Sequence, residues 1–224
     1  DSRALAESLV HVANGAGLPT VGLITDMNEP LGTAAGNALE VQLAVDFLTG
    51  KRIDPRMWEV TVALSAEMLV IGGLRPDLAE ARVAIEEAFT SGRAAEIFGS
   101  MVSALGGPID FVTKADSYLA KAPVVRPVHA PEAGTIASID ARAIGVAVVG
   151  LGGGRTRPQD AIDPSVGFSA LAGLGEDVGP DRPLGFVHAA SDAAAEAASA
   201  ALIAAYRLGD RPERGPSVIE RVGG

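Results

Sequence analysis

The sequence predicts a mixed α/β fold: part of an α/β domain, with a parallel strand packed against helices, followed by a small α+β domain. Three observations lead to this prediction. Several segments carry apolar residues at helical spacing and end in glycine. Short apolar runs of strand length lie between them. Strand-like runs become frequent only after about residue 121, so we expect one domain over residues 1–116 and another over 117–224.

The first helix, strand and loop are predicted at the start of the chain. Residues 2–14 have the apolar spacing of a helix, and Asn14-Gly15 ends it. Residues 20–25 form a continuous apolar run, which is typical of a buried parallel strand rather than an edge strand. Proline and glycine make residues 26–32 a loop, and a helix over about 33–48 completes one α/β unit.

The remaining elements follow the same signals. Three strongly apolar helices are expected next, over residues 55–71, 77–90 and 94–105. Beyond residue 121 we expect strands over 124–130, 134–139, 167–171, 184–188 and 217–222, with helices over 141–151 and 191–208.

Composition excludes several classes of function. The 224 residues carry a formal net charge of −10, whereas a nucleic-acid-binding surface is basic. There is no cysteine, so neither a disulfide nor a thiolate metal site can form. No apolar run reaches the roughly 20 residues that span a bilayer, and no signal-peptide pattern opens the chain. We therefore expect a cytoplasmic protein that binds neither nucleic acid nor membrane.

The most informative segment is Thr25–Glu40, where a predicted strand ends and a helix begins. Ligands of α/β folds bind at such strand ends, and a helix N-terminus offers free N–H groups to an anion. Small residues allow a close backbone approach there: Gly32, Ala34, Ala35 and Gly36. The alternative is a tight connection in which the glycines serve helix packing, and the residues alone leave both interpretations open.

Three separated motifs carry a family resemblance. They are residues 23–32 (LITDMNEPLG) with 35–41 (AGNALEV), residues 139–145 (IDARAIG) with 152–155 (GGGR), and residues 162–168 (IDPSVGF) with 174–175 (LG). In this order they resemble the thymidine and pyrimidine-nucleoside phosphorylases along essentially the whole chain. The second and third are more similar to the thymidine-specific bacterial branch.

The resemblance implies phosphorolysis of thymidine, in which inorganic phosphate attacks C1′ and releases thymine and 2-deoxyribose 1-phosphate. Fixed positive donors are needed for the phosphate, and hydrogen bonds for the departing base. The family also implies a homodimer and no organic cofactor.

The chain departs from the family in what it lacks. The family's phosphate loop and the Arg, Ser and Lys that hold the pyrimidine lie upstream of the strand that opens this chain, and so does its helical dimerisation domain. The first residue, Asp1, also indicates processing, truncation or a start partway through a longer product. We therefore expect no catalytic residue in this chain, and no activity without the N-terminal half of the enzyme.

Only a substrate-proximal loop can be carried over. The resemblance places Thr25, Asp26, Met27 and Asn28 beneath the pyrimidine pocket, with Met27 as an apolar wall. The alternative for Met27 is filling of the core. Asp26 and Glu29 might suggest an acid–base pair, but phosphate is already an anionic nucleophile. We interpret Asp26 as an acceptor that orders the loop.

The resemblance also bears on a potassium site. Relatives with a bound potassium ion use backbone carbonyls at the positions of Leu31 and Ala34 and a glutamate at the position of Leu43. Hard cations prefer oxygen ligands. Leucine offers none, which argues against the ion here.

Other conspicuous residues receive structural interpretations. The histidines His11, His129 and His188 lack metal-ligand spacing. The run Gly152–Gly154 matches no phosphate-binding pattern and is expected to stop a helix. Residues 174–184 resemble a biotinyl- or lipoyl-domain hairpin, but no lysine follows Lys121 to carry such a group.

Two other functional classes remain open. A binding or structural module could use the same folds without catalysis. A relative of the phosphoribosyltransferases is the third possibility, although the acidic pyrophosphate-binding loop of such enzymes is not evident in this sequence.

Overall fold

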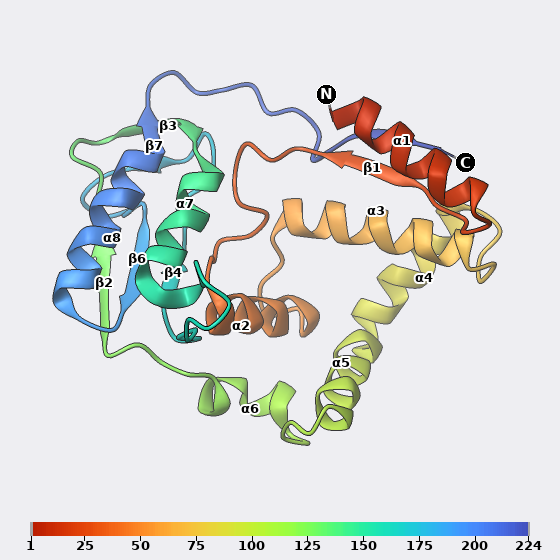
Figure 1. Ribbon diagram of the computed structural model, residues 1–224, viewed down its shortest axis with the longest axis horizontal. Helices are drawn as coiled ribbons and strands as arrows, with labels where there is room; N and C mark the ends of the chain where they lie inside the picture. Colours follow the sequence, from red (N-terminus) through yellow and green to blue (C-terminus); the bar gives the residue numbers. More distant parts are fainter. Residues whose placement is uncertain (1, 224) are drawn as a thin grey trace. The chain divides into compact units, whose positions relative to one another are not determined.

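A computed structural model describes residues 2–223 and confirms the mixed α/β class (Figure 1). The contacts divide the chain into two compact units. The first contains residues 1–26, 48–97 and 215–224, and the second contains residues 27–47 and 98–214. Because both units combine separated stretches, no single cut divides them, and the domain boundary expected at 116/117 stays a prediction.

The first unit pairs the beginning of the chain with its end. Helix α1 (Ser2–Gly15) precedes strand β1 (Gly22–Thr25), which pairs with β8 (Val218–Val222). The pairing is antiparallel, so the prediction of a buried parallel strand is wrong, and all four β1 residues are only partly buried. An apolar run indicates burial but not strand direction, which here depends on a partner almost 200 residues away.

Helices α3 (Pro55–Ile71) and α4 (Leu78–Thr90) form the other part of this unit, which also includes the start of α5 (Arg93–Ala104). An aspartate caps each N-terminus: Asp54 accepts from the backbone N–H groups of Arg56 and Met57, and Asp77 accepts from that of Glu80. A small apolar core joins α3 to α4, formed by Val62, Ala66, Ala81 and Ile85. Buried Glu67 of α3 holds Arg221 of β8 through two hydrogen bonds of 2.6 and 3.1 Å.

The second unit holds the main core. It begins with most of α2 (Asn37–Leu48) and includes the end of α5 and helix α6 (Phe111–Tyr118). One antiparallel sheet has the order β2–β6–β4, from Val124–Val128, Gly185–Ala189 and Gly167–Ser169. A second has the order β5–β3–β7, from Asp177–Val178, Gly134–Ile139 and Tyr206–Leu208.

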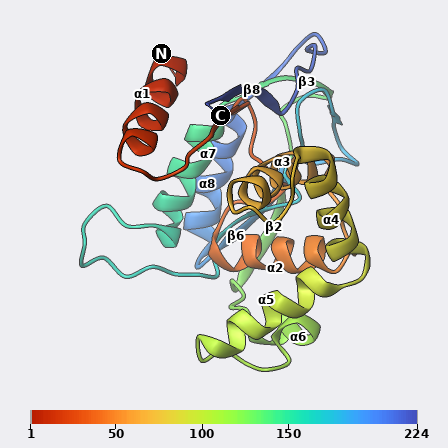
Figure 2. The ribbon, with the colours of Figure 1, turned by 90° about the vertical axis from the view of Figure 1, so that its right-hand side faces the viewer.

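Helices α7 (Ala141–Val148) and α8 (Asp192–Ala205) lie side by side against the β2–β6–β4 sheet (Figures 1 and 2). The Ala-rich face of α8 allows this close packing, because Ala195, Ala198 and Ala205 are all buried. The fully buried residues between the layers are mostly aliphatic and include Phe168, Ile136, Ile144, Leu184, Leu202, Val166 and Val187. This agrees with a sequence that has few aromatic residues.

Several element bounds differ from the sequence predictions. Helix α8 ends at Ala205 and the next three residues form β7, although residues 191–208 were expected to be one helix. Helix α7 passes at Val149 into a short π-helical turn, η1 (Val149–Gly153). Strand β5 has only two residues and carries no recognisable pattern. For β5 and β7 the pairing with β3, not local propensity, sets the bound.

The start of α2 shows the strongest tertiary effect. The helix begins at Asn37 rather than Thr33, because the residues before it pair with β4. Ala35 and Phe168 exchange two backbone hydrogen bonds of 2.9 and 2.7 Å. A Cβ on Gly36 would lie 2.4 Å from the Val166 carbonyl oxygen, and one on Gly167 would lie 2.1 Å from that of Ala35. The backbones therefore touch where both residues are glycine.

No helix among residues 2–223 is long and apolar enough to cross a membrane. Within the same residues, no group of three or more histidine or acidic side chains could hold a metal ion.

The glycine contact predicts a large loss of stability for Gly36→Ala. Gly36 has a φ of +132°, and the added methyl meets backbone that cannot move aside. We expect a loss of about 2–4 kcal/mol in the free energy of unfolding, measured by urea denaturation. Gly145→Ala is the matched control, because it adds a methyl in open space within α7. It should stabilise the protein by about 0.5–1 kcal/mol, and an equal loss in both variants would contradict the argument.

Candidate functional site

The expected substrate-proximal loop crosses the border between the two units. Thr25 and Asp26 belong to the first unit, whereas Met27 and Asn28 belong to the second. Each pair is therefore described within its own unit. Nothing in the structure tests whether these four residues approach a substrate, so that assignment stays a prediction.

Asp26 is held by an ion pair within the first unit. Its backbone N–H donates to the Ser217 carbonyl oxygen at 2.9 Å. Its carboxylate accepts from Arg56 at 2.8 Å, and a second nitrogen of this guanidinium donates to the Asp26 carbonyl oxygen. The two side chains are only 18% and 15% exposed, respectively. A carboxylate engaged in this way fits the interpretation of Asp26 as an acceptor that orders the loop.

Met27 and Asn28 border a hollow of about 440 Å³ in the second unit. Met27 is 75% exposed, so the alternative that its side chain fills the core does not hold. The hollow is also lined by the end of β3 and the start of α7, and by the end of α8 with Arg207 of β7. An exposed thioether at the rim of a hollow agrees with the expected apolar wall, which itself remains a prediction.

Glu29 fastens the loop to the C-terminal part of the second unit. Its carboxylate accepts from the Leu174 backbone N–H at 2.8 Å and lies 3.7 Å from Arg214. The side chain is only 11% exposed. The packing is so close that a Cβ on Gly173 would lie 3.0 Å from the carboxylate oxygen. This carboxylate therefore has a structural task within the second unit.

The small residues that follow serve protein packing. The Leu171 N–H donates to the Thr33 carbonyl oxygen at 2.9 Å, and the Ala38 N–H donates to that of Pro164 at 2.9 Å. The Gly36 N–H faces the Glu40 carboxylate at 3.3 Å. The N–H groups of Gly36 and Ala38 at this helix start are thus already engaged, and the close approach expected from the sequence is made to another stretch of the same chain.

The side chains at the potassium position do not fit the ion. Leu43 lies buried in α2 and has only carbon atoms to offer. At this position another group would have to supply the oxygen ligand that the glutamate provides in potassium-binding relatives. No step of the reaction is therefore assigned to a bound cation.

Two of the three histidines make structural hydrogen bonds. The Nε2 atom of His188 on β6 lies 2.8 Å from the Ser169 hydroxyl on the neighbouring β4. The Nδ1 atom of His129 lies 3.1 Å from the Gly179 carbonyl oxygen. His11 is exposed on α1. Burial lowers the pKa of the His188 imidazole below its ordinary value.

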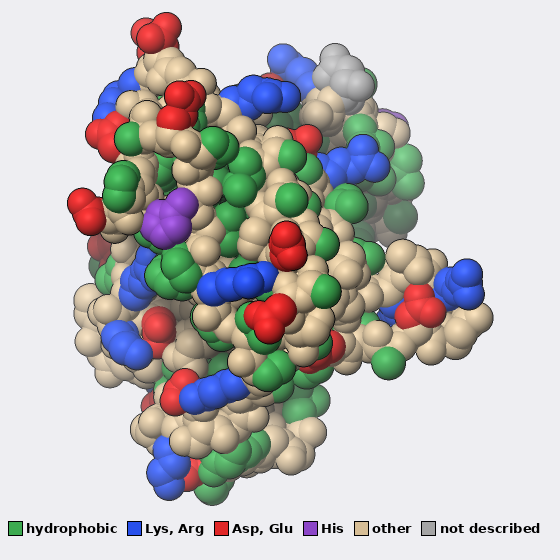
Figure 3. Space-filling view, turned by 90° about the vertical axis from the view of Figure 1, so that its left-hand side faces the viewer, with side chains coloured by type: hydrophobic (Ala, Val, Ile, Leu, Met, Phe, Trp, Pro, Cys, Tyr) green, Lys and Arg blue, Asp and Glu red, His purple; other side chains and the backbone are tan. Residues whose placement is uncertain are grey.

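The other conspicuous segments are also structural. Gly152 has a φ of +93° where η1 ends, as expected for a helix stop. In the segment 174–184, an ion pair of 2.8 Å joins Glu176 to Arg182. On the face drawn in Figure 3, basic side chains are scattered among acidic ones and form no broad basic area.

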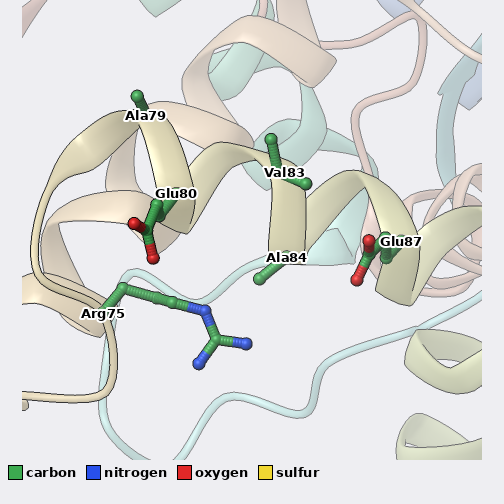
Figure 4. A pocket seen from close by; sticks show the side chains of 6 residues that line it. All are labelled: Arg75, Ala79, Glu80, Val83, Ala84 and Glu87. Atoms are coloured by element: carbon green, nitrogen blue, oxygen red, sulfur yellow. The ribbon is translucent and has the colours of Figure 1, made fainter.

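A second hollow, of about 350 Å³, lies along α4 in the first unit (Figure 4). Arg75 extends beside the helix, while Glu80 and Glu87 lie at the two ends of the hollow. Arg75 donates to the Leu74 carbonyl oxygen at 2.7 Å. Two carboxylates beside one guanidinium leave this surface acidic, which does not suit a phosphate ligand.

The sequence did not single out Arg56, or Arg142 and Arg207 of the hollow beside Met27. Arg56 is 30 residues from its partner, and Arg207 pairs across strands with Ser138. No spacing rule joins residues that far apart, so only the fold could identify them.

Part of the chain matches a model of a known protein family. The model of the pyrimidine nucleoside phosphorylase C-terminal domain matches residues 135–209, which contain β3, α7, the β6 strand and α8. The matched region lies inside the second compact unit.

The chain is also similar, over almost its whole length, to curated thymidine phosphorylases. The chain is 52% identical over 222 residues to the thymidine phosphorylase of Burkholderia orbicola (strain MC0-3), covering 99% of this chain and 51% of that protein. It is 52% identical over 221 residues to that of Burkholderia cenocepacia (strain HI2424), covering 99% and 50%. The chain thus matches the C-terminal half of these relatives. It spans about half of their length.

The ion pair beneath the loop predicts a stability effect. Asp26→Asn keeps the shape of the side chain but leaves the Arg56 charge without its carboxylate. We expect a loss of about 1.5–3 kcal/mol in the free energy of unfolding, measured by urea denaturation. Asp116→Asn is the control, since its partner Lys121 is exposed and surface pairs contribute little. A loss no larger than that of the control would show that the Asp26–Arg56 pair is not important.

The buried imidazole predicts a pH effect. Because the pKa of His188 is lower in the folded state, the unfolded chain binds this proton more readily. Its contribution to stability is complete above the unfolded pKa of about 6.5 and declines as the pH falls below it. His188→Gln should weaken this decline in denaturation series between about pH 5 and 8. The control His11→Gln should retain it, and identical slopes in wild type and His188→Gln would refute the assignment.

Proposed function

We propose that this chain is the C-terminal half of a thymidine phosphorylase. The observation that carries the proposal is 52% identity over 99% of the chain to proteins of that name, of which it covers half. The reaction is the attack of inorganic phosphate on C1′ of thymidine, which releases thymine and forms 2-deoxyribose 1-phosphate. The cytoplasmic location and the homodimer expected from the family are part of the same proposal.

The residues that contact phosphate and base are proposed to lie on the N-terminal half. The charges of the present chain support this division, because most arginines of the described residues are engaged by carboxylates or carbonyl oxygens. Asp26 and Glu29, the two carboxylates of the loop, are engaged within the protein. A transition state with developing charge needs donors fixed in place around it. This chain supplies the loop, and the other half would supply the donors.

Uncovered apolar surface supports a partner segment. Leu5, Leu9 and Val12 recur at helical spacing on α1 and are each at least 60% exposed. On α3, Leu64, Met68 and Ile71 have the same spacing and are 48%, 73% and 39% exposed. Helices that expose such a stripe normally bury it against protein. We propose that the N-terminal half of the enzyme covers these two apolar stripes, both of which belong to the first unit.

The function is tested by reconstitution. The chain alone should release no thymine from thymidine and phosphate above the rate in buffer. Adding a separately produced N-terminal half of a relative, such as that of the Burkholderia orbicola protein, should restore phosphorolysis, followed by the absorbance change of the base. Gly36→Ala, which disrupts the fold of the loop, is the control that should not be restored.

Two results would overturn the proposal. Phosphorolysis by the chain alone would show that the reactive groups lie within it. Complex formation without phosphorolysis would favour a non-catalytic module with the same folds. The reconstituted activity should also be the same in potassium and sodium chloride, because Leu43 replaces the glutamate ligand of relatives that bind potassium.

A further inference from the structure

The hollow beside Met27 contains a pair of basic side chains that the family assignment does not explain. Arg142 comes from the first turn of α7 and Arg207 from β7, and both line this hollow. Asn28, Ser138 and Asp140 supply its other polar side chains. All of these residues lie in the second unit, so the hollow is formed within one compact body.

Both guanidinium groups lack a protein partner. Neither Arg142 nor Arg207 makes a side-chain hydrogen bond or ion pair with any residue between 2 and 223. The chain has 28 acidic and 18 basic residues, so acceptors for a guanidinium group are plentiful. Arg126 and Arg182, in the same unit, both pair with carboxylates. Two cations left unneutralised in one hollow form a local positive site on an acidic protein.

The remaining charge in the hollow does not cancel this site. Asp140 is the N-cap of α7, and its carboxylate accepts from the Ala143 N–H at 2.9 Å. Its own N–H donates to the Ala205 carbonyl oxygen at 2.8 Å. One carboxylate thus faces two guanidinium groups, which leaves one net positive charge. The positive end of the α7 dipole lies at the same place.

We propose that this hollow binds a phosphate-class anion through Arg142 and Arg207. Guanidinium groups donate two parallel hydrogen bonds to the oxygens of a phosphoryl group, which suits this ligand better than a single-point anion such as chloride. The hollow of about 440 Å³ has room for inorganic phosphate and also for a phosphoryl group attached to a sugar. The Asn28 amide and the Ser138 hydroxyl are the neutral polar groups that a sugar would meet.

The inference goes beyond the proposed function and does not depend on it. It concerns an equilibrium binding site on this chain and requires no N-terminal half and no turnover. A chain that fails to support phosphorolysis could still bind phosphate here, and the reverse is equally possible.

The test is titration of the intact chain with inorganic phosphate and, separately, with 2-deoxyribose 1-phosphate, followed by isothermal calorimetry at low salt. Arg142→Gln and Arg207→Gln should each lower the association constant about two- to fivefold, the size expected for exposed ion pairs. The double variant should abolish measurable binding. Tighter binding of the sugar phosphate would assign the hollow to that ligand, and equal binding would assign it to the phosphoryl group alone.

The control is Arg157→Gln. Arg157 is exposed in the turn before Asp160, outside the hollow, and it is bonded to that residue through its backbone N–H and carbonyl oxygen. The substitution changes the net charge of the chain by the same amount, so binding should be unchanged. Equal weakening in all three single variants would mean general attraction and would overturn the proposal, as would undetectable binding of both ligands to the wild-type chain. Circular dichroism of each variant checks that the fold is retained.

Discussion

The contact between two backbone stretches, at Gly36 and Gly167, constrains the second unit more than any other interaction. One stretch precedes α2 and the other begins β4, and they exchange hydrogen bonds through Ala35 and Phe168. Neither glycine could carry a side chain without meeting a carbonyl oxygen. The same contact fixes where α2 begins and ties the loop after Met27 to the core around Phe168, which is fully buried.

This backbone contact changes the interpretation of the segment Thr25–Glu40. Small residues at the end of a strand suggest room for a ligand, but here the room is taken by residues 164–168. The acidic residues of the motif are likewise engaged, Asp26 by Arg56 and Glu29 by the Leu174 N–H. Both carboxylates of the motif therefore serve contacts within their own units, and among Thr25 to Asn28 the exposed side chains are Met27 and Asn28.

Charged side chains also serve contacts within the protein. The chain is acidic overall, and a buried or half-buried carboxylate is tolerated only where a donor meets it. Glu67 with Arg221 and Asp26 with Arg56 follow this rule in the first unit. Arg142 and Arg207 of the second unit differ from these arginines, because they are exposed and their charges are left to the solvent or to a ligand. Such departures indicate where a protein uses charge for binding instead of for its own stability.

The sequence by itself determined the mixed α/β class and the main helices, since the apolar period and the residues that cap a helix are local properties. The Asp54 and Asp77 caps, for example, lie where the helical pattern begins. Only the tertiary structure decided that β1 pairs antiparallel with β8, that α2 starts at Asn37 and that β7 follows α8 directly. The tertiary structure also decided which arginines pair with a carboxylate and which do not. These features depend on contacts between residues far apart in the chain, whose geometry is not encoded in any short stretch.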